Sequence, residues 1–482
     1  MNPFLVVLIV YGALLTVAGA FLARRTRNST DFFVAGRKLG PGLMFATVLA
    51  ANIGAGSTVG AAGLAYAIGL SGWWWVGSAG LGSLVLALAV GPRIRRLAAE
   101  HGFLTLGDFL EHRFGLAARL SVAVLLWAGT LAILAGQLIA FAWILQVVAG
   151  TSKTTGCLLG GVVVMTYFAA GGLKGAAWIN LFQLAVKGTG FLLCVPFALA
   201  AAGGWEGLRA ADLPADYFRL DGIGWQGMIH YLVLLAPSFI VSPGLLQKAF
   251  AGRDDRAVRL GIGANGIALL VFSALPVLLG MVAASRFPGL ANPELALPRV
   301  MTEVLPFWLG AWLLASVFSA EISSADAILF MLSTSLSQDL YRRVLRPAAD
   351  DRKVLRVSRW TALASGMLGI LCAIQLGSVL EALKLFYGLL SVALFVPVVA
   401  GLYHARPGGR VFLWALPASL AAAGLFHVLN DGRPIGPLSS TAVGIGVSAA
   451  IFLPFCRWRG AWGAARTHTD GNGQTPGDTG RL

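Results

Sequence analysis

The chain has 482 residues, of which 57% are hydrophobic and only 12% are charged, and its mean hydropathy is +0.78. An average soluble domain carries about 25% charged residues, so this composition excludes an ordinary soluble enzyme and a disordered protein. The formal net charge is +15, but no polar domain gathers the basic residues as a nucleic-acid binder would. We therefore expect a helical protein that crosses a membrane several times.

Thirteen apolar stretches are interpreted as spans, because a membrane helix needs about 20 apolar residues. The N-terminus turns apolar at Pro3 without a basic leader, and Arg24 and Arg25 follow this first stretch, which predicts a retained span rather than a cleaved signal. The predicted spans are 4–23, 41–69, 72–91, 119–148, 156–170, 177–202, 227–249, 260–285, 306–336, 360–377, 380–402, 411–428 and 439–456.

The basic residues predict the orientation of these spans, because lysine and arginine gather on the cytoplasmic side. With the N-terminus outside and the C-terminus inside, two of the 36 basic residues, Lys187 and Lys384, fall within spans. Only six lie outside: Lys153, Arg209, Arg219, Arg286, Arg299 and Arg433. Residues 457–482 are rich in Gly, Thr and Asp, and we expect them to form a disordered cytoplasmic tail. The Arg- and Ala-rich composition fits a multi-pass protein of a bacterial inner membrane.

Two spans contain residues that interrupt a helix halfway through the membrane. The second has four glycines in its middle beside Asn52, Ser57 and Thr58. Glycine weakens a helix, and polar side chains can partner the freed carbonyls. The seventh has Pro237 and Pro243, each of which removes an amide donor. The alternative for the glycines is close packing of small residues between helices.

The two interrupted spans open two blocks of five, the second to sixth and the seventh to eleventh. An odd number of spans in each block makes the two copies inverted. Paired broken helices in matching positions of two halves indicate a transporter binding site. We expect one transmembrane domain over residues 1–456, with an extra helix at 1–23, repeats at 41–202 and 227–402, and C-terminal helices at 411–456.

The ninth span carries a polar stripe, with Ala320, Ser323, Ser324 and Asp326 within two turns. Hydroxyls and a freed carbonyl are hard oxygen ligands that suit a small alkali cation, and a carboxylate in hydrocarbon is costly and by default functional. Glu321 is a second acid, about 100° around the helix from Ala320. The alternative is that the serines bond back to their own helix as packing residues.

The sixth span adds Asn180, Gln183 and Lys187, whose spacing of three and four places them on one helix face. Lys187 and Asp326 lie at the same depth from the inner edges of their spans, which predicts an ion pair between them. Such a pair has two interpretations. It is either purely structural, or it provides a charge that competes with or replaces a bound cation.

The chain resembles the sodium:solute symporter family from about Asp31 to Arg342, with weaker similarity beyond. The segments that carry the resemblance are DFFVAGRKLGPG, AANIGAGSTVGAAGLAYAIG, TLGDFLEHRFG, GGLKGAAWINLFQ, LLQKAFAGRD and SSADAILFMLSTSLSQDLY. The family includes carriers of proline, sugars, sialic acid, pantothenate and monocarboxylates. The resemblance implies the leucine-transporter-type fold, with five plus five inverted helices, and sodium-driven symport of a small polar organic solute by alternating access.

The resemblance also implies site residues. One sodium ion would lie between the second and ninth spans, held by the backbone carbonyls of Ala50, Ile53 and Ala320 and the hydroxyls of Ser323 and Ser324. The solute would lie at the two interrupted spans. Its nearest polar neighbours would be Asn52, Ser57, Thr58, Ser238 and Gln247.

Two positions of the sixth span depart from the family. Many members have Asp, as part of an ion path or second sodium site, where this chain has Asn180, and Lys187 is unexpected. A second cation or coupling site would consist of Asn180, Gln183, Lys187 and Asp326. The departures leave open a proton-coupled or cation-independent carrier of the same fold, in which the Lys187 ammonium replaces sodium.

Other classes of function are disfavoured. A channel is disfavoured because the chain lacks a repeated filter-like loop. An intramembrane enzyme would need a nucleophile–base pair or a metal cluster, but His230 and His427 are far apart and the four cysteines show no metal-site spacing. We expect no enzyme activity, no nucleic-acid partner and no obligate protein partner. The expected partners are a small-molecule solute and membrane lipid.

Overall fold

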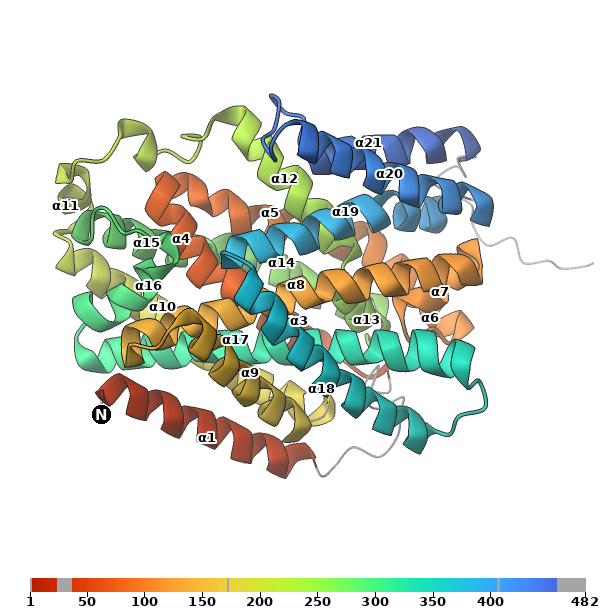
Figure 1. Ribbon diagram of the computed structural model, residues 1–482, viewed down its shortest axis with the longest axis horizontal. Helices are drawn as coiled ribbons and strands as arrows, with labels where there is room; N and C mark the ends of the chain where they lie inside the picture. Colours follow the sequence, from red (N-terminus) through yellow and green to blue (C-terminus); the bar gives the residue numbers. More distant parts are fainter. Residues whose placement is uncertain (1, 24–36, 171–172, 405–407, 457–482) are drawn as a thin grey trace, which may run out of the picture.

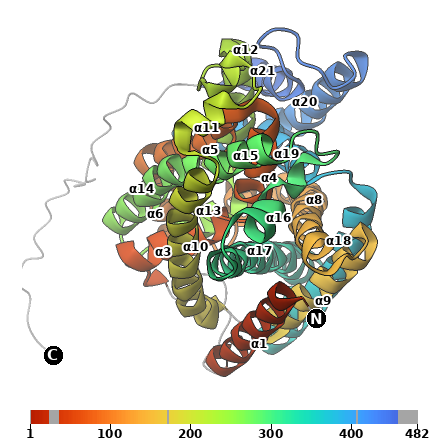
Figure 2. The ribbon, with the colours of Figure 1, turned by 90° about the vertical axis from the view of Figure 1, so that its left-hand side faces the viewer.

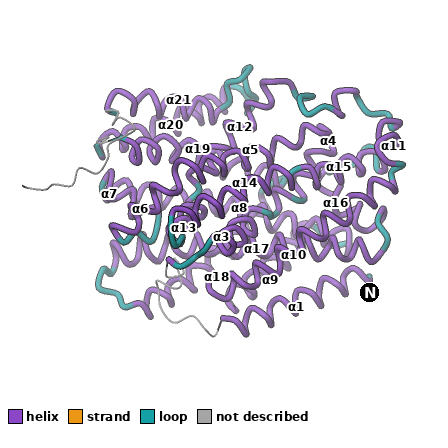
Figure 3. The backbone as a smooth tube through the Cα atoms, turned by 180° about the vertical axis from the view of Figure 1, so that it is seen from behind, coloured by secondary structure: helices purple, strands orange, loops and turns teal. Residues whose placement is uncertain are grey.

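The computed structural model describes residues 2–23, 37–170, 173–404 and 408–456. In these residues the fold is built from helices that run alongside one another, and no β-strand is formed (Figure 1). Figure 3 shows the same arrangement from behind, with short loops between the helices. The predicted all-helical class is confirmed. The predicted disordered tail lies outside the described residues.

The first six predicted spans each coincide with a helix or with a run of helices. The second is divided by a short 3-10 turn at Ala55–Ser57, and the third continues through a π-helical turn at Leu86–Val90. The helices of this half are α1 (Pro3–Ala23), α3 (Pro41–Asn52), α4 (Val59–Ile68), α5 (Trp73–Val85), α6 (Gly91–His101), α7 (Leu106–Phe114), α8 (Leu116–Ala149), α9 (Lys153–Ala170) and α10 (Leu173–Ala201).

The remaining predicted spans also coincide with helices. The helix of the ninth span continues as a π-helix over Ser335–Leu345. The helices of this half are α11 (Gly204–Ala210), α12 (Gly224–Val241), α13 (Pro243–Phe250), α14 (Asp255–Phe272), α15 (Ala274–Arg286), α16 (Ala296–Arg299), α17 (Phe307–Thr334), α18 (Asp351–Gln375), α19 (Val379–Tyr403), α20 (Gly409–Leu429) and α21 (Ser440–Phe452).

Helix capping explains one boundary that hydropathy alone placed poorly and a second that it placed within one residue. The helix of the tenth span begins at Asp351 rather than at 360, because the Asp350 side chain accepts a hydrogen bond from the Lys353 amide. The gap between α18 and α19 is very short because Ser378 caps α19 in the same way, accepting from the Glu381 amide.

Nine helical stretches within the described residues are long and apolar enough to cross a membrane, and shorter apolar helices accompany them. The number of spans and the orientation of the termini remain predictions. The most enclosed stretch contains α17. In its most apolar segment 83% of the residues are buried inside the protein, against 22% in that of α20. In the end-on view, α1 and α20 lie at opposite edges of the bundle (Figure 2). Helix α17 therefore provides the wall against which an internal site can be built.

Candidate functional site

The second span is interrupted where the sequence predicts. Helix α3 ends at Asn52, and Ile53 and Gly54 are extended, with φ, ψ of −93°, 97° and −145°, −157°. After the 3-10 turn, Thr58 leads into α4. The chain therefore exposes backbone carbonyls and amides halfway along the span, and each of these groups needs a partner inside the protein.

Side chains from two other helices provide some of these partners. The Gln137 Oε1 atom of α8 accepts the Ala55 amide at 2.9 Å, and the Trp75 Nε1 atom of α5 donates to the Gly56 carbonyl at 2.9 Å. Gly54 is required by close approach, since a Cβ there would collide with the hydroxyl of Ser324. The interruption is thus stabilised by specific contacts.

The seventh span is also interrupted, but at one proline rather than two. Ser242 is extended (φ −53°, ψ 122°) and Pro243 is the first residue of α13. A residue before proline is pushed out of the helical region, and proline suits the first helical position. Pro237 lies inside α12 without interrupting it. The hydroxyl of Ser238 donates to the Leu235 carbonyl at 2.7 Å.

The five predicted sodium ligands form one cluster between α3 and α17. The Ser323 hydroxyl lies 2.9 Å from the Ala50 carbonyl and 3.2 Å from the Ala320 carbonyl, and it can donate to either. The Ser324 hydroxyl lies 3.1 Å from the Ile53 carbonyl. We call these five residues the oxygen cage. Both serines are 2% exposed, so neither faces lipid.

The ammonium of Lys187 lies in the oxygen cage. From the middle of α10, its Nζ atom donates to the Ala50 carbonyl at 2.9 Å, to the Ile53 carbonyl at 3.2 Å and to the Ser323 hydroxyl. The side chain is completely buried. The carbonyl end of a helix carries partial negative charge, so the end of α3 favours a cation at this place. Three of the five oxygens expected to hold sodium therefore already accept hydrogen bonds from Lys187.

The predicted ion pair between Lys187 and Asp326 is wrong. The acid that acts electrostatically on Lys187 is Glu321, whereas Asp326 interacts with Lys248 of α13. The distance of each residue from the inner edge of its span predicted a similar depth in the membrane for Lys187 and Asp326. It could not predict which side chains lie beside each of them. The carbonyls at the broken end of α3, beside Ser323, hold the ammonium instead.

Glu321 is a buried carboxyl group that sequence reasoning noticed but could not place. It is 1% exposed, and its Oε1 atom accepts a hydrogen bond from the Thr58 hydroxyl at 3.1 Å. Its Oε2 atom has no hydrogen-bond partner. The carboxyl group therefore links α17 to the start of α4 and contributes the acidic group that acts on Lys187.

The four residues of the predicted second cation site are not joined by hydrogen bonds among the described residues. Gln183 is completely buried, and neither polar atom of its amide has a partner; the Asn180 Oδ1 atom has none either. Among the described residues, no hydrogen bond joins any two of Asn180, Gln183, Lys187 and Asp326. The group stays a prediction.

Most of the predicted solute neighbours already bond to the protein. The Asn52 amide donates to Asn265 at 3.1 Å, and the hydroxyls of Ser57 and Thr58 lie 3.1 and 2.9 Å from the Gly54 carbonyl. Gln247 lines a small cavity between α8, α13 and α17 together with residues that include Thr105, Trp127 and Asp339. Solute binding by these residues stays a prediction.

Sequence reasoning missed an aromatic cluster beside the interrupted second span. The Trp75 ring lies 6.0 Å from Tyr231 of α12 and 6.1 Å from Tyr387 of α19, and the Tyr387 ring lies 5.5 Å from Phe239. These rings come from three separate helices. No spacing in the sequence could have revealed the cluster, because helix packing alone brings the rings together.

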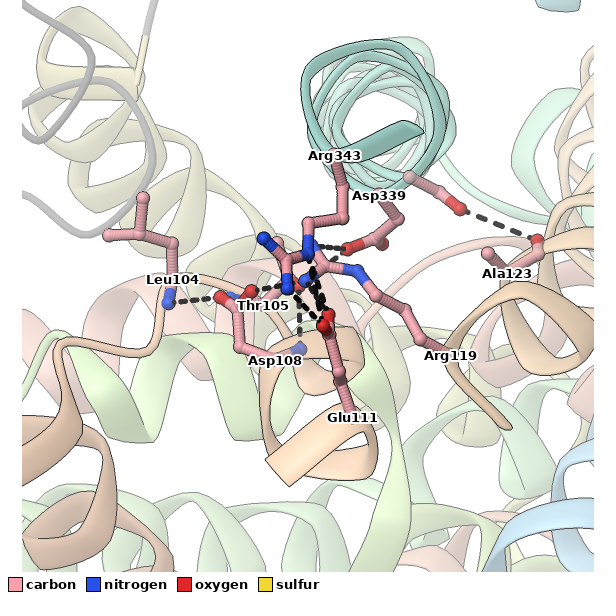
Figure 4. A network of polar contacts seen from close by, with 9 residues as sticks. Leu104, Thr105, Asp108, Glu111, Arg119, Ala123, Asp339 and Arg343 are labelled. Carbon is pink, nitrogen blue, oxygen red and sulfur yellow. Dashed lines mark hydrogen bonds and ion pairs between the residues drawn. The ribbon is translucent and has the colours of Figure 1, made fainter. Parts of the chain in front are cut away.

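A second cationic centre lies at the predicted inner end of the bundle (Figure 4). Arg119, at the start of α8, is 5% exposed and lies 2.8, 2.8 and 2.7 Å from the carboxylates of Asp108, Glu111 and Asp339. Arg343 forms a further ion pair with Glu111. We call these five residues the Arg119 cluster. The hydrogen bonds from Arg343 hold the pKa of Glu111 below its usual value.

Comparisons with known proteins bear on the family and the fold. The profile of the Sodium:solute symporter family matches residues 32–416. The sodium/glucose cotransporter of Vibrio parahaemolyticus is 25% identical, over 87% of this chain and 84% of that protein. The sodium/pantothenate symporter of Escherichia coli (strain K12) is 28% identical, over 88% and 90%. The solved substrate-bound, outward-open structure of a Na+-coupled sialic acid symporter superposes with a TM-score of 0.78 at 17% identity, over 93% and 96%.

The structural likeness confirms the leucine-transporter-type fold. The relatives are transporters and not enzymes, and with the apolar helices they make this chain a multi-pass protein of the cell membrane. Family membership supports sodium-coupled symport of a small-molecule solute. Because the family profile covers most of its length, the chain belongs to the sodium:solute symporter family.

Proposed function

We propose that this chain carries a small polar organic solute into the cell by alternating access. The observation that supports this most strongly is the pair of interrupted spans, at Ile53–Thr58 and at Ser242. Unwound backbone inside a membrane is tolerated where it lines a cavity or is buried in protein. Transporters use paired interruptions of this kind to bind solute near the midplane.

The solute would bind near the two interruptions and the aromatic cluster. Asn52, Ser57, Thr58 and Ser238 bond to neighbouring groups in this structure, so they would serve the solute only after a local change of partner. Trp75, Tyr231 and Tyr387 add apolar surface with polar edges, a combination that suits a small organic molecule. Rocking of one helix group against the other would then open the site to each side in turn.

The experiment begins with a thermal-shift screen of the purified protein against small polar metabolites. Compounds that raise the melting temperature are then tested for uptake into proteoliposomes. We expect saturable uptake and counterflow of the labelled compound. Conductance without saturable exchange would contradict a carrier and favour a channel.

A pair of glutamine variants sharpens the solute assignment. Gln247 is buried and lines the cavity between α8, α13 and α17, whereas Gln226 is exposed at the other end of the seventh span. Gln247→Ala is expected to raise the solute concentration needed for half-maximal uptake, and Gln226→Ala to leave it unchanged. Equal behaviour of the two variants would remove Gln247 from the solute path.

A further inference from the structure

The strongest unexplained group in the molecule is the buried side chain of Lys187. It is completely enclosed within the protein, at a depth where an unpaired charge is costly. Such a residue persists only when its charge and all its donors are satisfied.

The hydrogen bonds of Lys187 account for all three of its ammonium protons. They go to the Ala50 carbonyl, the Ile53 carbonyl and the Ser323 hydroxyl. All three acceptors are neutral oxygens, and none is a carboxylate. Neutral carbonyl and hydroxyl oxygens are also the ligands expected around a bound sodium ion. The ammonium therefore places one positive charge where a bound sodium ion would place one.

We infer that Lys187 is a built-in cation that replaces sodium in the oxygen cage, so that solute transport by this chain does not require sodium. The inference rests on the proposed function, since it concerns the cation of that same carrier. A tethered ammonium can hold α3 against α17, as a sodium ion would, but it cannot leave the cage on either side of the membrane.

The charges around the oxygen cage also oppose an added sodium ion. Among the described residues, the ionisable groups that act on Lys187 are Glu321 and Lys248. Glu321 is the acidic group of the two, and Lys248 is a second basic group, which interacts with Asp326. A sodium ion beside the ammonium would place two positive charges close together in a medium of low dielectric constant.

A sodium ion could also enter by displacing Lys187 from the oxygen cage, but the packing of α10 opposes this. Helix α10 packs against both α3 and α17, and its close approach to α17 depends on Gly190, where a Cβ would collide with the Ser316 hydroxyl. A displaced ammonium would need new acceptors in the membrane interior. The neighbouring polar groups on its own helix face are the amides of Asn180 and Gln183, which carry no negative charge.

The test compares melting temperatures of the purified protein in sodium chloride and in potassium chloride at equal concentration. We expect the two values for the native chain to agree within about 1 °C, because no sodium binds to the folded state. Lys187→Ala frees the cage oxygens, so its melting temperature should fall in potassium and recover by several degrees in sodium. Lys384→Ala, which removes a lysine elsewhere in the membrane region, serves as the control and should not respond to sodium.

Two outcomes would overturn the inference. One is saturable, sodium-specific stabilisation of the native chain that is lost in Ser323→Ala. The other is a folded Lys187→Ala variant whose melting temperature is the same in sodium and in potassium, because the oxygens would then not form a sodium site even when free. If Lys187→Ala does not fold, radioactive sodium binding to the native chain decides: no specific binding supports the inference, and saturable binding overturns it.

These measurements need no solute, which separates the inference from the proposed function. Failure of the carrier proposal would appear as the absence of saturable uptake for every compound found in the screen. Failure of the lysine inference would appear as sodium binding. For a compound that is taken up, rates that are equal in sodium and in choline media are the expected result.

Discussion

The oxygen cage and the Arg119 cluster hold one helix, α17 with its π-helical extension, at two levels, and each encloses a buried cation. Lys187 is bound by neutral carbonyl and hydroxyl oxygens. Arg119 is bound by three carboxylates, two from α7 and one from the π-helical extension of α17. The first arrangement consists of neutral oxygens of the kind that coordinate a free alkali cation, and here they accept hydrogen bonds from a tethered ammonium. The second is a fixed ionic connection, because its carboxylates cannot stay buried together without the guanidinium.

The largest expected effect comes from removing the cation of the Arg119 cluster. Arg119→Ala leaves Asp108, Glu111 and Asp339 without their shared partner, and loss of a partner from a buried ion pair costs about 3–5 kcal/mol. We expect a large fall in melting temperature in detergent. Arg96→Ala is the control, because Arg96 pairs with Asp255 but is 53% exposed, and such pairs contribute about 1 kcal/mol or less. Similar melting temperatures for the two variants would contradict the comparison.

The next effect tests which acid balances Lys187. Lys187→Met removes hydrogen bonds to neutral oxygens and leaves Glu321 alone, so we expect a loss of about 1–3 kcal/mol. Adding Glu321→Gln should recover part of that loss, since a lone buried carboxylate is then absent. Asp326→Asn in the same background should add its own cost without recovery. Recovery with Asp326→Asn and not with Glu321→Gln would instead support the pair first predicted from the sequence.

The smallest effect concerns the exposed edge of the Arg119 cluster. Arg343 is 53% exposed, so Arg343→Ala should cost about 1 kcal/mol or less. Because Arg343 lowers the pKa of Glu111 from its ordinary 4.5, the stabilisation is present above pH 4.5 and is lost as the pH falls through the lower folded-state value.

Melting temperatures measured from neutral to acidic pH check this prediction. The native chain and Arg343→Ala should differ at neutral pH and converge below the folded-state pKa of Glu111. Arg346→Ala, at a neighbouring exposed arginine, should follow the native chain throughout. A difference that grows toward acidic pH would contradict the assigned sign.

The sequence was most informative where the signal is local. Glycines at 54 and 56 and a proline at 243 change the backbone of their own span, so both interruptions could be predicted. The same reasoning wrongly gave Pro237 an equal role, because a proline within a helix can be accommodated by its neighbours. Apolar length located the helices, while side-chain caps such as Asp350 set ends that hydropathy could not show.

Contacts between distant spans could not be predicted in the same way. Gln137 and Trp75 bond to the interrupted second span from other helices, and no spacing pattern connects them to it. The partner of Lys187 was predicted from depth alone, which fixes one coordinate along the helix but leaves its rotation and its neighbours open. The resemblance placed the five residues of the oxygen cage, and the structure added the lysine that lies among them.

The most direct measurement is an experimental structure of the native chain determined in sodium and again in potassium. We expect Lys187 Nζ to stay bound to the carbonyls of Ala50 and Ile53 in both structures, with no ion density between α3 and α17. Ion density in the sodium structure, with the Lys187 side chain turned away from Ser323, would contradict it.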